Sequence, residues 1–317
     1  MIIQPMNQAL NGVAPLPHWG VIRVEGEDAA AFLHGQLTQD FALLDAGHAR
    51  LAAFCSAKGR MLASFMGFKR GPGEILLLCS RDLLAPTLKR LSMFVLRAKA
   101  KLSDATDAWT VRGLAGDAVA AAVPGGLAPW ARADVAAGDA VASVVGLYPA
   151  DGVPRALWVA PVGTPEPAGP ALSAERWQWG EVRSAVATLS APVAEAFVPQ
   201  MLNYESVGGV NFKKGCYPGQ EVVARSQFRG TLKRRAYLVR STAPLAAGQE
   251  VFHAGDAEQA CGTVVQAAAV PQATDGAWDA IVSMQVGAAD GGALALGAAG
   301  GPALVLQPLP YALLDDI

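Results

Sequence analysis

Cysteine and histidine are scarce in this chain, and neither forms a pattern typical of a metal site. The 317 residues contain four of each. No two cysteines lie close enough for a Cys-x-x-Cys motif, which excludes a zinc ribbon and a thioredoxin-like pair, and four are too few for a disulfide scaffold. No histidines pair at a spacing of two or four residues, so no metal site is predicted. The cysteines are Cys55, Cys79, Cys216 and Cys261, and the histidines are His18, His34, His48 and His253.

Charge and long apolar runs are limited as well. Charged residues make up 16% of the chain and hydrophobic residues 52%, with a net charge of −2. These values exclude a disordered chain and a protein that is basic over its whole surface. Residues 1–12 lack the basic and apolar regions of a signal peptide, and the charge-free stretch 291–314 is too often broken by glycine and proline for a membrane helix. We therefore expect a cytoplasmic protein with reduced thiols and no membrane partner.

The patterns of the N-terminal part predict mixed α and β structure. A short strand is expected at 21–24, and apolar residues recur at helical spacing after Asp28. An apolar stripe at spacings of three and four residues predicts a helix after Ser80. Strands followed by a packing helix favour an α+β fold over a doubly wound sheet. Between these helices, three apolar runs separated by turn residues predict a β-meander, at 51–55, 61–68 and 74–79.

The remainder of the chain changes in composition. Residues 104–171 are rich in Ala, Gly and Pro and give weak helix and strand signals, with a linker predicted at 161–170. A short helix is expected after Ser173. Beyond Arg235, short apolar runs separated by Gly, Pro and Asp predict a small barrel or sandwich. The length favours roughly two domains, and we place the boundary at residue 235, which divides the chain into 1–235 and 236–317.

Positive charge is concentrated in one segment. Residues 211–235 contain seven basic residues and Glu221, a charge of +6 in a chain whose total is −2. Such a segment predicts an anionic partner, a phosphate, a carboxylate or a nucleic acid. A solvated basic surface beside a domain junction explains the same pattern.

Within this segment, the turn residues around Cys216 precede a helix expected at 220–227. A sulfur just outside a helix N-terminus and beside two lysines favours the thiolate, which is the reactive form. Gly215 permits a close approach of the backbone. The alternative is a small buried side chain in a tight turn, and no histidine lies within the segment to act as a base.

Other candidates also have structural explanations, and aromatic residues on a helix more often belong to the core than to a ligand site. Trp177 and Trp179 are placed to stack on a flat ring or to fill the core. Asp82 is a candidate catalytic carboxylate or a capping residue at a helix start. The three cysteines outside the basic segment lie in apolar strands and are interpreted as core residues.

The nine residues from Lys213 to Glu221, KKGCYPGQE, resemble the signature of the YgfZ-type folate-binding proteins, which are relatives of the glycine-cleavage T-protein, an aminomethyltransferase. This motif is highly specific. Two supporting blocks fit the same family, FLHGQLTQD at 32–40 and SAKGRM at 56–61. The similarity also extends through parts of 197–209 and 222–234, so that it spans most of the chain.

The resemblance implies an aminomethyltransferase-like α+β fold with three domains around a central channel. Two interleaved domains would occupy 1–235, the second at about 50–140, and a C-terminal β-barrel domain would follow at 236–317. A tetrahydrofolate-type ligand would bind in the channel. The implied role is to assemble or maintain iron–sulfur clusters, with a link to tRNA modification, so the implied partners are iron–sulfur enzymes or their assembly machinery and, indirectly, tRNA. Members have no clearly assigned reaction of their own, and we expect a monomer.

The same resemblance indicates which residues belong to the site. Cys216 is the residue most closely tied to function and is the candidate catalytic group. The pterin ring would stack in an aromatic and apolar channel, with the glutamate tail of the ligand attracted to basic residues such as Lys213. The candidate folate-binding residues are Lys214, Gly215, Tyr217, Gln220, Glu221, Arg225, Trp179, Glu181 and Arg183.

Two positions depart from the related enzymes. T-proteins carry a catalytic Asp in an Asn-Ala context after the third strand, whereas this chain has Ser80-Arg81-Asp82 there. The family also has a folate-contacting Glu at the position that Arg183 occupies here. Glu181 is the candidate to replace it, although side chains two residues apart leave a helix about 200° from each other.

Three hypotheses about function follow. The first is a folate-binding accessory protein of iron–sulfur metabolism. The second is a folate-dependent aminomethyl or one-carbon transferase, which requires a carboxylate such as Asp82 or Glu181 beside the ligand nitrogen. The third is a nucleic-acid-binding module that uses the basic segment and whose RNA affinity falls steeply with salt. The total charge of −2 argues against the third.

Overall fold

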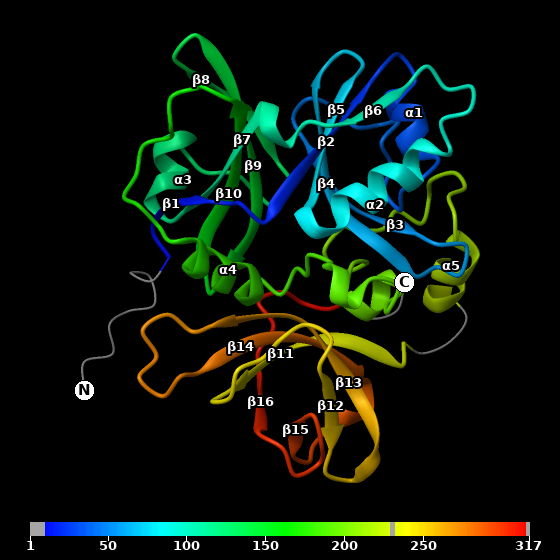
Figure 1. Cartoon of the computed structure of the whole chain (residues 1–317), viewed down its shortest axis with the longest axis vertical. Coiled ribbons are helices and arrows are strands. Elements are labelled where there is room, and N and C mark those ends of the chain that lie inside the picture. Colours follow the sequence, from blue (N-terminus) through cyan, green and yellow to red (C-terminus); the bar gives the residue numbers. More distant parts are fainter. Residues whose placement is uncertain (1–9, 229–231, 315–317) are drawn as a thin grey trace.

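The computed structural model describes residues 10–228 and 232–314 and contains two five-stranded sheets and a closed six-stranded barrel. All strand pairs within these sheets are antiparallel. The two sheet units lie side by side, and the barrel lies below them in the view of Figure 1. No helix in the described part of the chain is long and apolar enough to cross a membrane.

The first sheet has the order β3-β4-β5-β2-β6 and contains the predicted meander. Its strands alternate or are continuously apolar because one or both faces are buried. Helix α2 begins after Ser80 and packs on β2, β5 and β6. The elements are β2 (Trp19–Glu25), α1 (Ala29–His34), β3 (Ala49–Cys55), β4 (Met61–Gly71), β5 (Glu74–Ser80), α2 (Arg81–Ser92) and β6 (Lys101–Asp104).

The second sheet has the order β1-β7-β10-β9-β8. It lies in the Ala-rich region whose strand signals were too weak to predict, because its central strands are buried along most of their length and do not alternate. The elements are β1 (Gly12–Pro15), η2 (Thr106–Ala108), β7 (Trp109–Ala115), α3 (Asp117–Ala122), β8 (Arg132–Ala137), β9 (Ala140–Ala150) and β10 (Val153–Pro161).

The two sheets divide the chain differently from the predicted second domain at about 50–140. That range combines β3, β4, β5 and β6 of the first sheet with β7 and β8 of the second. The reason is that β1 and β2, which are neighbours in sequence, join different sheets. Interleaving of this kind has no local sequence signal, because it depends on which distant strands pair.

The barrel begins at Arg234, one residue before the predicted boundary, and closes in the order β11-β14-β13-β12-β15-β16. The α+β architecture with a C-terminal barrel is confirmed, and the alternative of a sandwich is excluded by closure. The short β15 was not predicted. The barrel elements are β11 (Arg234–Ser241), β12 (Glu250–His253), β13 (Asp256–Ala269), β14 (Trp278–Gln285), η5 (Val286–Ala288), β15 (Leu294–Leu296) and β16 (Ala303–Gln307).

A connecting region joins the sheets to the barrel. Helix α4 starts at the predicted place, where the Ser173 hydroxyl accepts a hydrogen bond from the Arg176 N–H. It contacts β1 and β9 of the second sheet and β13 and β14 of the barrel, and one continuous apolar core includes residues of both sheets, α4 and the barrel. The elements are α4 (Ala174–Arg183), η3 (Ala191–Val193), η4 (Pro199–Leu202) and α5 (Gln220–Phe228).

Candidate functional site

The three sequence blocks that carry the family resemblance meet in the folded chain. The buried Lys214 ammonium donates hydrogen bonds to the carbonyl oxygens of His34 and of Leu37, the latter at 2.7 Å. It also lies 4.7 Å from the centre of the Tyr217 ring. These contacts tie the cysteine loop to the end of α1, because the last carbonyls of a helix have no partners within it. Burial lowers the pKa of Lys214 to about 8, although Asp40 acts in the opposite direction.

The third block, the turn between β3 and β4, packs directly on the same loop. Gly219 has φ +79°, and a Cβ atom there would lie 2.7 Å from the Cα and N of Gly59 and would collide with the Ser56 carbonyl. A Cβ on Gly59 would in turn meet Val222 at 2.9 Å. Two glycines are therefore required where the turn and the loop touch.

Cys216 lies in this loop and is exposed. Its neighbour Gly215 stands against His34, whose Nε2 would lie 3.3 Å from a Cβ at that position. The Nδ1 of His34 is 3.0 Å from Asp40 Oδ1, so a histidine–carboxylate pair borders the cysteine loop. Sequence reasoning noted the absence of a histidine within the segment, and missed this one because it comes from α1.

The remaining residues of the motif lie on the surface beside it. Glu221 and Arg225 are exposed and form an ion pair with each other, as expected one turn apart on α5. Gln220 is half-buried at the start of the same helix. Arg229 of the basic segment falls outside the described residues. None of the motif residues lines the inner cavity described next, so the cysteine loop is separate from that cavity.

The inner cavity lies where the two sheets and α4 meet. It has about 40 Å³ of open space, enough for a few water molecules. Its lining is largely aromatic and apolar, with one carboxylate and one guanidinium. The residues that define it are Trp19, Trp130, Tyr148, Arg155 and Glu181.

Glu181 is the buried carboxylate of this cavity. It accepts hydrogen bonds from the indole N–H groups of Trp19, at 2.9 Å, and Trp177, at 2.8 Å, and lies 3.1 Å from His18 Nε2. Burial alone would raise its pKa, but the hydrogen bond and charge of His18 and the charge of Arg155 outweigh burial and hold the pKa below its ordinary value. Glu181 is therefore an ionised acceptor at the cavity wall.

Arg155 supplies the cation. Its guanidinium lies 4.4 Å from the centre of the Trp177 ring, and its buried Nε has no hydrogen-bond partner among the described residues. Burial lowers its pKa to about 10, partly offset by Glu181. An unpartnered buried donor beside an open space is expected to bind an acceptor.

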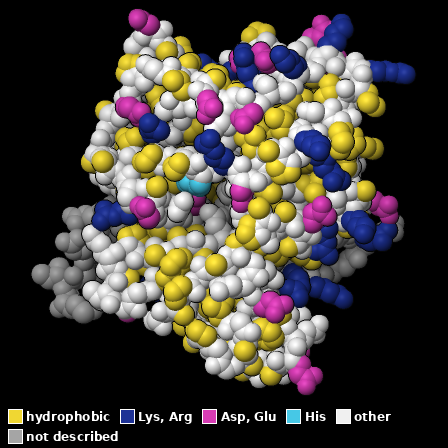
Figure 2. All heavy atoms as spheres, in the orientation of Figure 1, with side chains coloured by type: hydrophobic (Ala, Val, Ile, Leu, Met, Phe, Trp, Pro, Cys, Tyr) yellow, Lys and Arg dark blue, Asp and Glu magenta, His cyan; other side chains and the backbone are white. Residues whose placement is uncertain are grey.

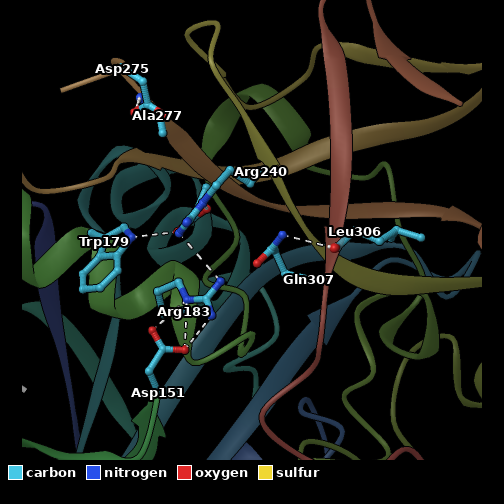
Figure 3. A network of polar contacts seen from close by, with 9 residues as sticks. Asp151, Trp179, Arg183, Arg240, Asp275, Ala277, Leu306 and Gln307 are labelled. Carbon is cyan, nitrogen blue, oxygen red and sulfur yellow. Dashed lines mark hydrogen bonds and ion pairs between the residues drawn. The ribbon is translucent and has the colours of Figure 1, made fainter. Parts of the chain in front are cut away.

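Trp179 and Arg183 point away from the cavity and hold α4 to the rest of the molecule (Figure 3). The Trp179 indole donates to Asp279 at 2.9 Å. Arg183 forms an ion pair with Asp151 at 2.6 Å and lies 3.8 Å from Asp279. Neither lines the inner cavity. Glu181 and Arg183 thus face different neighbours, and Glu181 is the one that reaches the cavity.

An outer cleft of about 560 Å³ shares Glu181 and Thr188 with the inner cavity. Most of its lining residues are polar, and they include His18, Arg81 and Asp82. Both oxygens of Asp82 have partners, since one accepts from the Ser80 hydroxyl at 2.6 Å and the other from the Ala191 N–H at 2.9 Å. Asp82 therefore tethers the start of α2 to the start of η3.

Comparisons with known proteins place these features in a family. No family model matches the chain. The tRNA-modifying protein YgfZ of Photorhabdus laumondii is 30% identical over 312 residues, which cover 95% of this chain and 92% of that protein. The protein of the same name from Klebsiella pneumoniae is 32% identical over 265 residues, covering 80% of this chain and 79% of that protein.

Among solved structures, the glycine cleavage system aminomethyltransferase T of Bartonella henselae is similar to this chain, with a TM-score of 0.63. The match covers 97% of this chain and 90% of that one at 16% sequence identity. The two chains therefore share a fold while their sequences have diverged widely.

Proposed function

Because the chain belongs to the YgfZ protein family, we propose that it is a tetrahydrofolate-binding accessory protein that supports iron–sulfur cluster assembly or repair and is linked to tRNA modification. In this proposal the inner cavity holds the folate and Cys216 provides thiol chemistry on the surface. The observation that carries the proposal is the ionised Glu181 carboxylate, buried beside Arg155 and aromatic rings where two sheets and α4 meet.

The chemistry of the cavity fits a pterin ring. Glu181 is placed to accept hydrogen bonds from ring N–H groups, and the unpartnered Nε of Arg155 to donate one to a ring oxygen. The rings of Trp19, Trp130 and Tyr148 provide flat surfaces. Tetrahydrofolate, when bound, supplies nitrogen atoms that carry one-carbon groups. The open space of about 40 Å³ is smaller than a bicyclic ring, so half-buried side chains such as Trp130 and Tyr148 would have to move on binding.

The glutamate tail of the folate would leave through the outer cleft. Arg81 lines that cleft and forms no ion pair among the described residues, so it is the cation best placed for a carboxylate. Lys214 and Arg225, two of the candidate folate-binding residues, are committed elsewhere. Lys214 binds helix-end carbonyls and Arg225 pairs with Glu221.

A titration with tetrahydrofolate, followed by tryptophan fluorescence, tests the proposal. We expect saturable binding, and the Glu181→Gln variant should bind about 10- to 100-fold more weakly, because a hydrogen bond to a charged group contributes roughly 1.5–3 kcal/mol. Glu205→Gln is the matched control, since Glu205 is also buried but pairs with Arg235 away from the cavity. Absence of binding by the intact protein, or equal loss in both variants, would contradict the proposal. Circular dichroism establishes that each variant is folded.

The role of Cys216 is tested in cells. The Cys216→Ala variant should fail to support iron–sulfur enzymes, yet it should bind tetrahydrofolate as the unaltered protein does, because the loop does not line the cavity. Full complementation by this variant would show that the thiol is not functional.

The second candidate function, a folate-dependent aminomethyl transferase, is supported by one observation. Asp82 and Glu181 both line the outer cleft. Glu181 lines both the outer cleft and the inner cavity, whereas Asp82 lines the outer cleft alone, so Glu181 is the carboxylate placed to act beside the reacting nitrogen. Incubation of the protein with tetrahydrofolate and an aminomethyl donor tests this alternative, and absence of turnover would remove it.

A further inference from the structure

A large cleft between α5 and the barrel has no part in the function proposed above. Its volume is about 920 Å³, near the upper end of the roughly 300–1,000 Å³ typical of ligand sites. Its floor is formed by η4, which contacts α5 on one side and β11 and β14 on the other. We call it the α5–barrel cleft, and its main lining residues are Val198, Gln200, Met201, Ser226, Lys233 and Arg234.

A buried polar atom in this cleft lacks a partner. Gln200 is fully buried, and its Nε2 donates to the Val223 carbonyl at 2.7 Å. Its Oε1 accepts no hydrogen bond from the described residues. A buried amide oxygen that is left unpaired costs about 1–3 kcal/mol, so a ligand with an N–H donor would satisfy it.

The charge around the cleft is positive. Lys233 and Arg234 line it, and no acidic residue in the described part of the chain does. Arg60 adds a third cation beside it, because its Nη1 lies 3.9 Å from the sulfur of Met201. None of the three forms an ion pair with any residue in 10–228 or 232–314. Arg60 Nη1 donates to the Ala196 carbonyl at 2.6 Å and Arg234 Nη1 to the Cys261 carbonyl at 3.1 Å, so each keeps its charge and its other N–H groups for a phosphate. Figure 2 shows Lys and Arg side chains gathered on the side of the molecule where Figure 1 places α5 and the start of the barrel.

Apolar groups accompany these cations. Val198 and Met201 form part of the cleft lining. An apolar surface beside cations contacts unpaired bases while their phosphates are neutralised.

We propose that the α5–barrel cleft binds a single-stranded stretch of RNA. Lys233, Arg234 and Arg60 contact phosphates, and the Gln200 amide oxygen accepts a hydrogen bond from a base. The inference rests on the proposed link to tRNA modification, and it assigns that link to a surface separate from the inner cavity. An acidic protein segment would satisfy the same cations and would also offer N–H donors, so RNA is preferred because of that proposed link, and a polyglutamate competitor distinguishes the two.

Fluorescence anisotropy tests the inference with two labelled probes, a twelve-nucleotide oligouridylate and a tRNA transcript, each at low and moderate salt. We expect both to bind. The Lys233→Glu variant should bind about tenfold more weakly, and its logarithmic dependence of affinity on salt should be less steep by about one unit, as for the loss of one phosphate contact. Arg234→Gln should act in the same direction and provides a second, milder change.

Lys89→Glu is the matched control, because Lys89 lies on the exposed face of α2, forms no ion pair with any described residue, and changes the total charge equally. Equal weakening by Lys233→Glu and Lys89→Glu would overturn the assignment, as would absence of binding by the unaltered protein. Two competitors complete the test. If uridine monophosphate binds as tightly as the oligomer, the cleft is a free-nucleotide site. If polyglutamate displaces RNA when added at the same total negative charge, the partner is an acidic protein segment. Either result overturns the proposal.

The folate titration keeps this inference separate from the proposed function. Lys233→Glu should bind tetrahydrofolate normally, and Glu181→Gln should bind RNA normally. If the unaltered protein binds folate but not RNA, only the cleft assignment is disproved. If it binds RNA but not folate, only the folate site is disproved.

Discussion

Three of the four thiols lie in strands, and only Cys216 lies in an exposed loop. Burial raises the pKa of Cys55 and of Cys79 to about 12 and also raises that of Cys261. The buried thiols are therefore protonated at neutral pH and shielded from reagents, and the thiolate is the form that reacts.

We predict that iodoacetamide at pH 8 labels one cysteine in the native protein and four after denaturation. Mass spectrometry of the intact chain provides the count. The Cys216→Ala variant should take up no label when native and three after denaturation, while Cys261→Ala should retain the native label. Rapid native labelling of a second cysteine would show that the strands are less protective than their burial indicates.

At the same scale, the sequence predicted which thiols are buried better than it predicted which side chains lie beside a thiol. The apolar runs around Cys55 and Cys79 were enough to place them in the core. The His34–Asp40 pair beside the cysteine loop comes from α1 and the segment after it, and no spacing rule connects residues so far apart. Likewise, the indole partners of Glu181 include Trp177 on the same helix, but Trp19 comes from β2.

At the scale of elements, the contact between the cysteine loop and the β3–β4 turn depends on Gly219. Its φ of +79° is a conformation that side chains with a Cβ rarely adopt, and a Cβ would also collide with the turn. Gly163 has φ +87°, and a Cβ atom at that position would have open space for 4 Å around it. Backbone strain is expected when either glycine is replaced, whereas a steric collision is expected only at Gly219. Comparing the two positions therefore distinguishes the two effects.

We predict that Gly163→Ala lowers the free energy of unfolding by about 1–2 kcal/mol, the cost of a left-handed residue with a Cβ. Gly219→Ala should lower it by about 1–3 kcal/mol more, because the turn and the loop must move apart. Urea unfolding of both variants measures the difference. Equal losses of unfolding free energy in the two variants would mean that the turn and the loop move apart at no energetic cost.

Helices and strands were predicted correctly where apolar residues recur at a clear spacing. The strands of the meander and helix α2 have distinct apolar periodicity and flanking turn residues, and the structure confirms them. Strands β9 and β10 were missed because they are buried along most of their length and show no alternation, and short apolar runs do not distinguish a strand from a helix. The barrel strands other than β15 were predicted as short apolar runs, but closure of the barrel depends on pairs such as β11 with β16.

At the scale of the whole molecule, a buried carboxylate joins α4 to the barrel. Asp279 on β14 accepts from the Trp179 indole of α4 and from Arg240 of β11, the latter at 2.7 Å. Arg183 of α4 lies 3.8 Å away and pairs with Asp151 in the turn between β9 and β10. The network of Figure 3 thus spans the second sheet, α4 and the barrel.

We predict that Asp279→Asn lowers the free energy of unfolding by about 1.5–3 kcal/mol, because a neutral amide replaces the charged, fully buried acceptor of the Trp179 indole and of Arg240. The barrel should also unfold separately from the sheets, which would appear as non-coincident urea transitions by fluorescence and circular dichroism. Asp45→Asn is the control, since Asp45 forms an exposed pair with His48 and such pairs contribute about 0–1 kcal/mol. An effect no larger than that of the control would show that the network does not hold the barrel in place.

The sequence by itself determined the class of this protein. Its apolar runs, turn residues and helix starts depend on neighbours a few residues apart, so they predicted the α+β start and the strands of the C-terminal part, and the KKGCYPGQE motif indicated the family. Only the tertiary structure decided that Glu181 faces a cavity while Arg183 holds the barrel, that Cys216 lies away from that cavity, and that two sheets interleave across residues 12–161. These arrangements arise from strand pairing and from the packing of one shared core, which join residues as many as 180 positions apart.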